Sequence, residues 1–99
     1  MKEYLIALTS LNLSEHQIET IDAKLFEKFK NLTELYLSGN KLTRIDASTF
    51  KPLMKLTILD LSNNLIDKMD MKRLKNCTDL TGLYLNNNKL TRLDADTFK

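Results

Sequence analysis

The amino-acid sequence predicts an α/β-type repeat solenoid, in which short parallel strands stack into one sheet and irregular segments return the chain between strands. Three observations lead to this prediction. Residues 32–42 read L-x-x-L-x-L-x-x-N-x-L, and steps of 24 residues recover this pattern in four copies without insertion or deletion. Two leucines in each copy alternate with polar residues, as in a strand with one buried face. The remainder of each copy is long enough to connect parallel strands.

The framework of the repeat consists of positions that stay nearly uniform from copy to copy. We expect strands near residues 10–14, 34–38, 58–62 and 82–86. Their inward leucines form two columns: Leu11, Leu35, Leu59 and Leu83, and Leu13, Leu37, Leu61 and Leu85. Stacking these columns would create one continuous apolar core along the array.

An aspartate opens the return segment of every copy. The four residues of this column are Asp22, Asp46, Asp70 and Asp94. An aspartate at the start of a short helical or 3₁₀ turn can accept a hydrogen bond from the free backbone N–H groups there. We therefore interpret the column as a set of caps rather than as a cation-binding ladder, because hard cations need six or more converging oxygens.

A polar column follows the strands and consists of His16, Asn40, Asn64 and Asn88. A buried amide at this position can bond to backbone groups freed where the chain turns, in its own repeat and in the next one. For His16, one interpretation is that the imidazole fills the same slot. The other is a pH-sensitive spot, for which His16→Asn would stabilise the fold more at acid pH than at neutral pH.

The whole chain, residues 1–99, is expected to form one domain. Its repeats are 8–31, 32–55, 56–79 and the incomplete 80–99, and residues 1–7 correspond to the end of a preceding repeat. The last copy would leave an apolar end face uncovered. Two explanations stay open: the chain is a fragment of a longer array, or its ends stack on another copy.

Composition excludes several function classes. With 15 basic and 13 acidic residues, the net charge of +2 is too balanced to indicate nucleic acid as a partner. No apolar run is long enough to span a membrane, and the run 4–8 is too short for a signal peptide. A single cysteine, Cys77, excludes an internal disulfide framework.

Over essentially its whole length the sequence resembles the leucine-rich repeat family, in its "typical" 24-residue subclass found in Toll-like receptors and variable lymphocyte receptors. The resemblance rests on the L-x-x-L-x-L-x-x-N-x-L pattern and on the phenylalanine column Phe26, Phe50 and Phe98. It implies a curved, right-handed superhelix with the parallel sheet on the concave face and irregular or 3₁₀ returns on the convex face. It also implies a parent protein that is extracellular or on the cell surface, although the residues alone assign no compartment.

The sequence predicts neither an enzyme nor a cofactor or metal site. Cys77 would need a base within hydrogen-bond reach, and the only histidine, His16, stands more than two repeats away. At about 4.8 Å per repeat, the two are separated by roughly 12 Å along the axis alone. The same separation excludes a zinc site built from Cys and His.

The side chains most suited to binding are the polar alternates of the strand leucines, which vary among copies. In the family, partners often bind this concave face. The predicted partner-binding residues are Asn12, Glu34, Tyr36, Ile58, Asp60, Tyr84 and Asn86. The leading hypothesis is a scaffold that binds a protein partner through this face, which carries no Lys or Arg. The alternative is a structural unit that self-assembles into homo-oligomers through its uncapped end faces.

Overall fold

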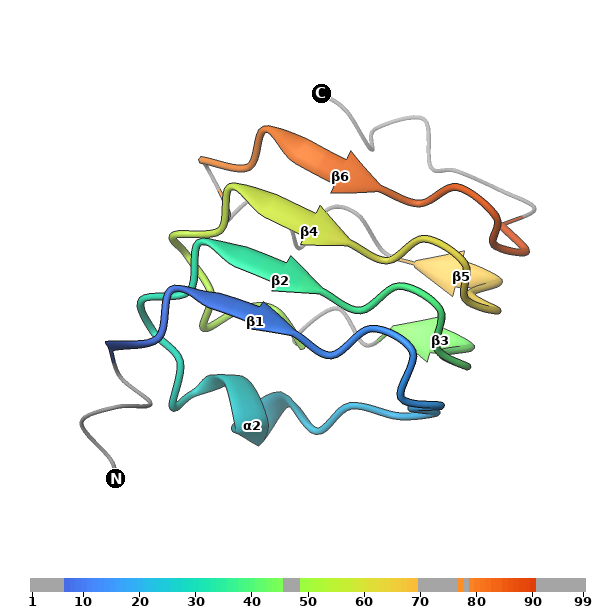
Figure 1. The fold of residues 1–99 in the computed structure, drawn as a ribbon, viewed down its shortest axis with the longest axis horizontal. Coiled ribbons are helices and arrows are strands. Elements are labelled where there is room, and N and C mark those ends of the chain that lie inside the picture. The colour runs from blue at the N-terminus through green and yellow to red at the C-terminus, as the bar shows by residue number, and fades with distance from the viewer. Residues whose placement is uncertain (1–6, 46–48, 70–76, 78, 91–99) are drawn as a thin grey trace.

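The computed structural model describes residues 7–45, 49–69, 77 and 79–90. It confirms a curved solenoid built on a parallel sheet (Figure 1). Four strands lie side by side in the order β1-β2-β4-β6. They are β1 (Ser10–Asn12), β2 (Glu34–Tyr36), β4 (Ile58–Asp60) and β6 (Gly82–Tyr84). The register pairs every strand residue with the one 24 positions later, as for Leu11 and Leu35, so the sequence period and the strand register coincide.

Each strand covers only the first three residues of its predicted five-residue range, but the backbone hydrogen bonds continue beyond it. The N–H groups of Leu13, Leu37 and Leu61 donate to the carbonyl oxygens of Tyr36, Asp60 and Tyr84, each at 2.8 Å. The next bonds run from Glu15 to Ser38 and from Asn63 to Asn86, both at 2.9 Å. The chain therefore stays paired while it turns away from the sheet.

A column of threonines leads into the strands and was not recognised in the sequence. The backbone N–H of Thr33 donates to the carbonyl oxygen of Thr9 at 2.7 Å, and its hydroxyl donates to the same oxygen at 3.1 Å. Thr57 and Thr81 repeat both bonds to the threonine one copy earlier. These paired bonds satisfy a carbonyl at the strand entry and fix the register there.

In the described residues, the return segments hold one short helix and two short strands. A short helix, α2 (Ala23–Phe26), follows Asp22, whose Oδ1 accepts a hydrogen bond from the Lys24 N–H at 2.9 Å. This bond confirms the predicted capping role in the first copy, whereas Asp46, Asp70 and Asp94 lie outside the described residues. Two short strands, β3 (Arg44–Ile45) and β5 (Lys68–Met69), form a second parallel sheet that the sequence analysis did not predict.

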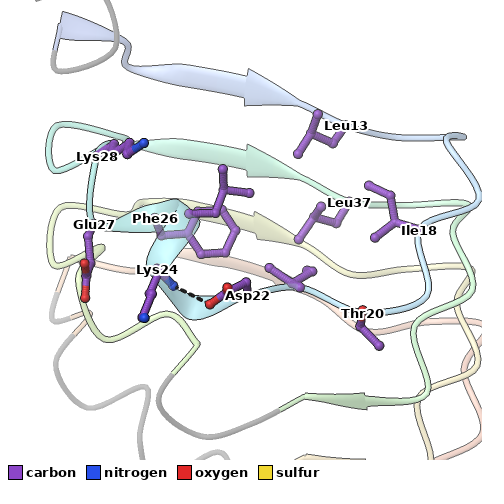
Figure 2. A pocket seen from close by; sticks show the side chains of 11 residues that line it. Leu13, Ile18, Thr20, Asp22, Lys24, Phe26, Glu27, Lys28 and Leu37 are labelled. Carbon is purple, nitrogen blue, oxygen red and sulfur yellow. Dashed lines mark hydrogen bonds between the residues drawn. The ribbon is translucent and has the colours of Figure 1, made fainter. Parts of the chain in front are cut away.

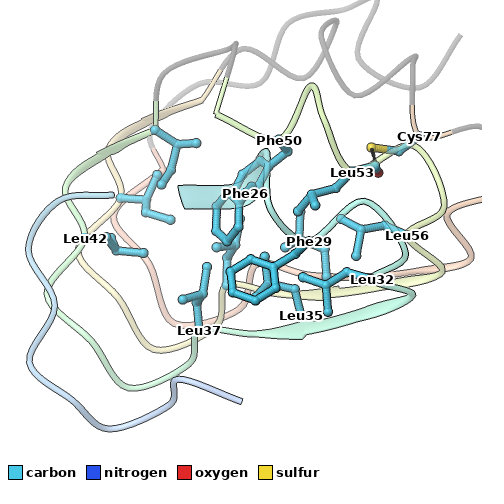
Figure 3. Close-up of a cluster of buried hydrophobic side chains, with 14 residues drawn as sticks. Phe26, Phe29, Leu32, Leu35, Leu37, Leu42, Phe50, Leu53, Leu56 and Cys77 are labelled. Atoms are coloured by element: carbon cyan, nitrogen blue, oxygen red, sulfur yellow. Dashed lines mark hydrogen bonds between the residues drawn. The ribbon is translucent and has the colours of Figure 1, made fainter. Parts of the chain in front are cut away.

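The core lies between the main sheet and the returns (Figure 3). In the interior copies the inward strand leucines, such as Leu35 and Leu59, are fully buried. The rings of Phe26 and Phe50 pack against each other at a centroid distance of 5.9 Å. In the outer copies the equivalent residues Leu11 and Leu83 are only partly buried. Burial therefore falls from the middle of the array toward both ends.

No helix in the described part of the chain is long and apolar enough to cross a membrane. Within the described residues, the segments around the sheet are short turns and extended stretches, apart from the four-residue α2 and the two-residue strands β3 and β5. Stability therefore depends on stacking between copies rather than on the intrinsic stability of helices.

Cys77 is a buried structural thiol, as its column neighbours suggest. Its Sγ lies 3.4 Å from the carbonyl oxygen of Leu53, one copy earlier (Figure 3). Burial raises the pKa of the Cys77 thiol above its ordinary value of 9.0. The thiol therefore stays protonated at neutral pH, which removes the nucleophilic form.

We expect the stabilising contribution of Cys77 to decline in alkaline solution. Above about pH 9 the thiol of the unfolded chain ionises while the buried thiol does not, so the unfolded state binds fewer protons and becomes more favourable. Urea unfolding of the native chain and of Cys77→Ala, at about pH 7 and about pH 10, measures this effect. The stability difference between the two proteins should narrow at the higher pH. A constant difference would contradict the prediction.

Candidate functional site

The candidate site is the outward side of the main sheet, called here the strand face: Asn12, Glu34, Tyr36, Ile58, Asp60, Gly82 and Tyr84. The strand register brings these residues into two rows across the sheet. One row runs Glu34, Ile58, Gly82, and the other runs Asn12, Tyr36, Asp60, Tyr84. The structure thus brings together six of the seven predicted site residues. The seventh, Asn86, lies two residues beyond β6 and is exposed.

Tyr36 is held against its own strand rather than projecting freely. Its hydroxyl donates to Glu34 Oε1 at 2.7 Å. This hydrogen bond, followed by partial burial and by the negative charges of Glu34 and Asp60, raises the pKa of Tyr36 above 10.0. The phenol therefore stays neutral, and its ring is presented in a fixed position.

Tyr84 leans in the same direction along its strand, and Gly82 makes room for it. A Cβ atom on Gly82 would lie 3.3 Å from a ring carbon of Tyr84 and 3.5 Å from Ile58. Tyr84 itself is 50% exposed. Gly82 was assigned no role from the sequence. In the sequence, Gly82 is distinguished by the larger side chains that its column carries in the other copies. The missing side chain gives the Tyr84 ring space above the sheet.

Asp60 and Asn12 share a local structural role. Asp60 Oδ1 accepts hydrogen bonds from the N–H of Ser62 at 3.0 Å and from its hydroxyl at 2.6 Å. In the first copy Asn12 Oδ1 accepts from the Ser14 N–H at 2.9 Å. These bonds orient both side chains where the strand ends. The two hydrogen bonds from Ser62 therefore hold the Asp60 carboxylate in place.

The asparagine column connects neighbouring copies, but in the direction opposite to the one expected. Asn40 Oδ1 accepts from the N–H groups of His16 and Ile18, at 3.0 and 2.9 Å. Its Nδ2 donates to Leu13 of the previous copy and to Leu37 of its own. The amide therefore bonds to the preceding repeat rather than to the next one. These side chains belong to the framework and not to a binding site.

His16 does not fill the buried slot that the sequence suggested. Its side chain is exposed, and Nδ1 lies 2.6 Å from the carbonyl oxygen of Ser14. Because a carbonyl oxygen only accepts, Nδ1 carries the proton in this contact. Both interpretations of His16 assumed a buried imidazole, and this premise is wrong because the side chain is exposed.

The turn after each strand passes through the left-handed backbone region. Glu15, Gly39, Asn63 and Asn87 occupy one column, with φ values of 62°, 68°, 55° and 59°. Glycine and asparagine tolerate this conformation, which explains three of the four residues. Glu15 is the exception, and its carboxylate occupies the space where a Cβ of Gly39 would stand. The column is shaped by backbone geometry as well as by its position beside the strand face.

An apolar hollow of about 720 Å³ lies at the N-terminal end of the solenoid, between the main sheet and α2 (Figure 2). Leu13, Ile18, Phe26 and Leu37 point into it. Its position matches an end face, where core residues of a further copy would pack. In the described part of the chain, no group of three or more His, Cys, Asp or Glu residues could hold a metal ion.

These features define a class of protein: a solenoid of 24-residue leucine repeats with a uniform core and a varied strand face. The sequence matches the family described as leucine rich repeat over residues 6–66 and 54–99. The chain therefore belongs to the leucine-rich repeat family, whose members generally act as protein-interaction scaffolds rather than as catalysts.

The chain is similar to solved structures of receptor-like proteins and of a bacterial protein. It is 31% identical to Toll in the Drosophila Toll–Spatzle complex, with a TM-score of 0.80, covering 95% of this chain and 13% of that one. It is 36% identical to TLR13 in its complex with ssRNA13, with a TM-score of 0.87, and the match covers 95% of this chain and 13% of that one. It is 32% identical to the functional domain of InlJ from Listeria monocytogenes, with a TM-score of 0.74, and the match covers 97% of this chain and 20% of that one.

The chain thus spans only about an eighth to a fifth of the length of these similar proteins. No curated protein matches the sequence significantly. The similarity accordingly concerns a segment of a few repeats within each of these longer chains.

Proposed function

We propose that residues 1–99 form a single protein-interaction module that binds a protein partner through the strand face. The observation that carries this proposal is the contrast between two sets of columns. The inward leucines and asparagines are uniform and are occupied by packing and backbone bonds. The outward residues change from copy to copy, and they include two oriented tyrosines, Tyr36 and Tyr84. Aromatic residues held rigidly lose little entropy on binding, which makes them effective anchors.

A protein partner is favoured over nucleic acid by the charge of the strand face. TLR13, one of the similar structures, is complexed with single-stranded RNA, whereas Toll is complexed with Spatzle. In this chain the strand face carries the carboxylates of Glu34 and Asp60 and no Lys or Arg. Carboxylates repel a phosphate backbone, whose recognition depends on basic side chains. A catalytic role is not proposed, because the site offers neither a nucleophile paired with a base nor a set of metal ligands.

Site-specific photo-cross-linking tests the proposed face. A photoreactive phenylalanine analogue at position 84 should cross-link the intact chain to a discrete protein partner in an extract of its source cells. The matched control places the same analogue at position 54, because Met54 is 61% exposed on the return side. Tyr36→Ala should weaken the cross-link from position 84. Equal cross-linking from both positions, or cross-linking from position 54 alone, would overturn the proposal.

Self-assembly is the second candidate, and the end of the array favours it. Leu80, Leu83 and Leu85 are partly buried where their interior equivalents are fully buried. The apolar hollow at the opposite end offers a surface onto which such leucines could pack. Sedimentation velocity over a range of concentrations tests this candidate. A strict monomer at high concentration would exclude it, whereas dimers or longer species would support it.

A further inference from the structure

The geometry points to an arginine side chain of a basic protein partner as the group that the strand face recognises. Its stem would lie over Ile58 between the rings of Tyr36 and Tyr84, and its guanidinium would meet the Asp60 carboxylate. This inference rests on the proposed function and specifies the chemistry of its partner.

Ile58 and Asp60 lie between the two strands that carry the tyrosines. The register places Tyr36 directly beside Asp60 on one neighbouring strand and Tyr84 beside it on the other. Both tyrosines lean along their strands, Tyr36 toward Glu34 and Tyr84 over Gly82, and these are the residues that flank Ile58 in the register. Because neighbouring strands lie about 4.8 Å apart, an aliphatic stem over Ile58 can contact both rings while its charged end lies at Asp60.

Glu34 and Asp60 each keep one carboxylate oxygen that accepts no hydrogen bond from the described residues. Both hydrogen bonds from Ser62 go to Asp60 Oδ1, and the Tyr36 hydroxyl bonds to Glu34 Oε1. Among the described residues, none donates a hydrogen bond to Asp60 Oδ2 or Glu34 Oε2, and none forms an ion pair with either carboxylate. Two carboxylates thus keep one acceptor oxygen each for an external donor. Charge-assisted bonds of this kind are stronger than neutral ones.

The apolar surface beside Asp60 favours arginine over lysine. Ile58 is a half-buried apolar residue beside Gly82, where the absence of a side chain leaves the Tyr84 ring close to the sheet. A long aliphatic stem can cover Ile58 while its charged end reaches the carboxylate. The planar guanidinium also stacks on aromatic rings and offers several donors in fixed directions, whereas an ammonium is a strongly hydrated point charge.

Nuclear magnetic resonance titration of the full chain tests this inference with defined probes. The probes are the blocked pentapeptide Gly-Ser-Arg-Ser-Gly and the same peptide with citrulline, the neutral isostere of arginine, in place of Arg. The arginine peptide should shift the backbone amide resonances of residues 58–62 and 82–84. We expect its affinity to be about five-fold or more above that of the citrulline peptide.

A pair of charge variants locates the effect. Asp60→Asn should reduce the affinity for the arginine peptide to that for the citrulline peptide. The fold tolerates this change, because Asn12 occupies the same column and keeps the equivalent bond to Ser14. The matched control is Glu27→Gln, which removes one exposed carboxylate beside α2 and should leave the affinity unchanged.

The possible failures are distinguishable. Equal shifts with the arginine and citrulline peptides, or no shift at the strand face with either, would overturn the inference about arginine. Neither result bears on cross-linking from position 84, which tests the proposed function separately. A single-stranded RNA oligonucleotide that shifted the same resonances, with affinity increased by Asp60→Asn, would also overturn the inference. An arginine-specific shift lost only in Asp60→Asn would support it.

Discussion

Replacing Leu59 by alanine is expected to lower the free energy of unfolding by about 3 to 5 kcal/mol. Leu59 is fully buried in the central sheet strand β4, with copies stacked on both sides. The truncation removes apolar contacts and leaves a cavity that neighbouring copies cannot fill without shifting the strand register. Urea unfolding followed by far-ultraviolet circular dichroism measures the loss.

The matched control is the same substitution in the last strand, Leu83→Ala. Leu83 is only partly buried, and we expect a loss of about 1 to 2 kcal/mol there, because less surface is returned to water. Equal losses at the two positions would show that the outer copy is packed as tightly as the interior, contrary to the structure.

Asn64→Ala is expected to destabilise the fold by about 3 kcal/mol or more. The Asn64 side chain is 4% exposed. Its Oδ1 accepts from the Leu42 N–H at 3.1 Å, and its Nδ2 donates to three carbonyl oxygens at 2.9 to 3.1 Å. Alanine would leave the Leu42 N–H without a partner in a place that water reaches poorly. It would also remove one of the two donors from each carbonyl oxygen, which would keep only its second donor, Asn40 Nδ2, Asn88 Nδ2 or the Gly39 N–H. Calorimetric or urea unfolding gives the measurement.

Two further variants separate hydrogen bonding from size. Asn64→Asp keeps the acceptor for Leu42 but loses the three donated bonds, so it should cost at least as much as alanine at neutral pH. Asn88→Ala should cost less, because Asn88 is half-exposed and water can replace part of its bonding. A harmless Asn64→Asp would contradict the assigned roles of Oδ1 and Nδ2.

The repeat period predicted most of the architecture because equivalent residues must stack. Leucine columns that never lose register require parallel strands paired at the same interval, and Leu11 does pair with Leu35. The cap at Asp22 was also predictable, since a short polar side chain before a helical turn has few other roles. The period therefore determined the strand order and the identity of the core.

Other features depend on geometry that a one-dimensional pattern does not contain. The two-residue strands β3 and β5 are too short to produce a periodic signal. The asparagine column could bond to either neighbour, and only the course of the turn directs Asn40 to the preceding copy. Thr33 resembles any polar residue next to a strand until its two bonds to Thr9 are visible.

The membership of the candidate site was likewise more predictable than its arrangement. Alternation along the strands placed Tyr36, Asp60 and Tyr84 on one face, and the register confirms this placement. The lean of Tyr36 toward Glu34 and of Tyr84 over Gly82 depends on side-chain rotamers and on a missing Cβ. Their binding role stays a prediction for the experiments described above.

Because the sequence period equals the strand register, a whole interior copy can be removed or duplicated without shifting the leucine columns of the remaining copies. Excision of residues 32–55 would bring β1 beside β4 with every leucine column still aligned, because the step removed is one full period. The outward row would then read Asn12, Asp60, Tyr84, without Tyr36. Recombination between copies can thus change the set of outward side chains in one step, while the leucine columns that fold the chain stay aligned.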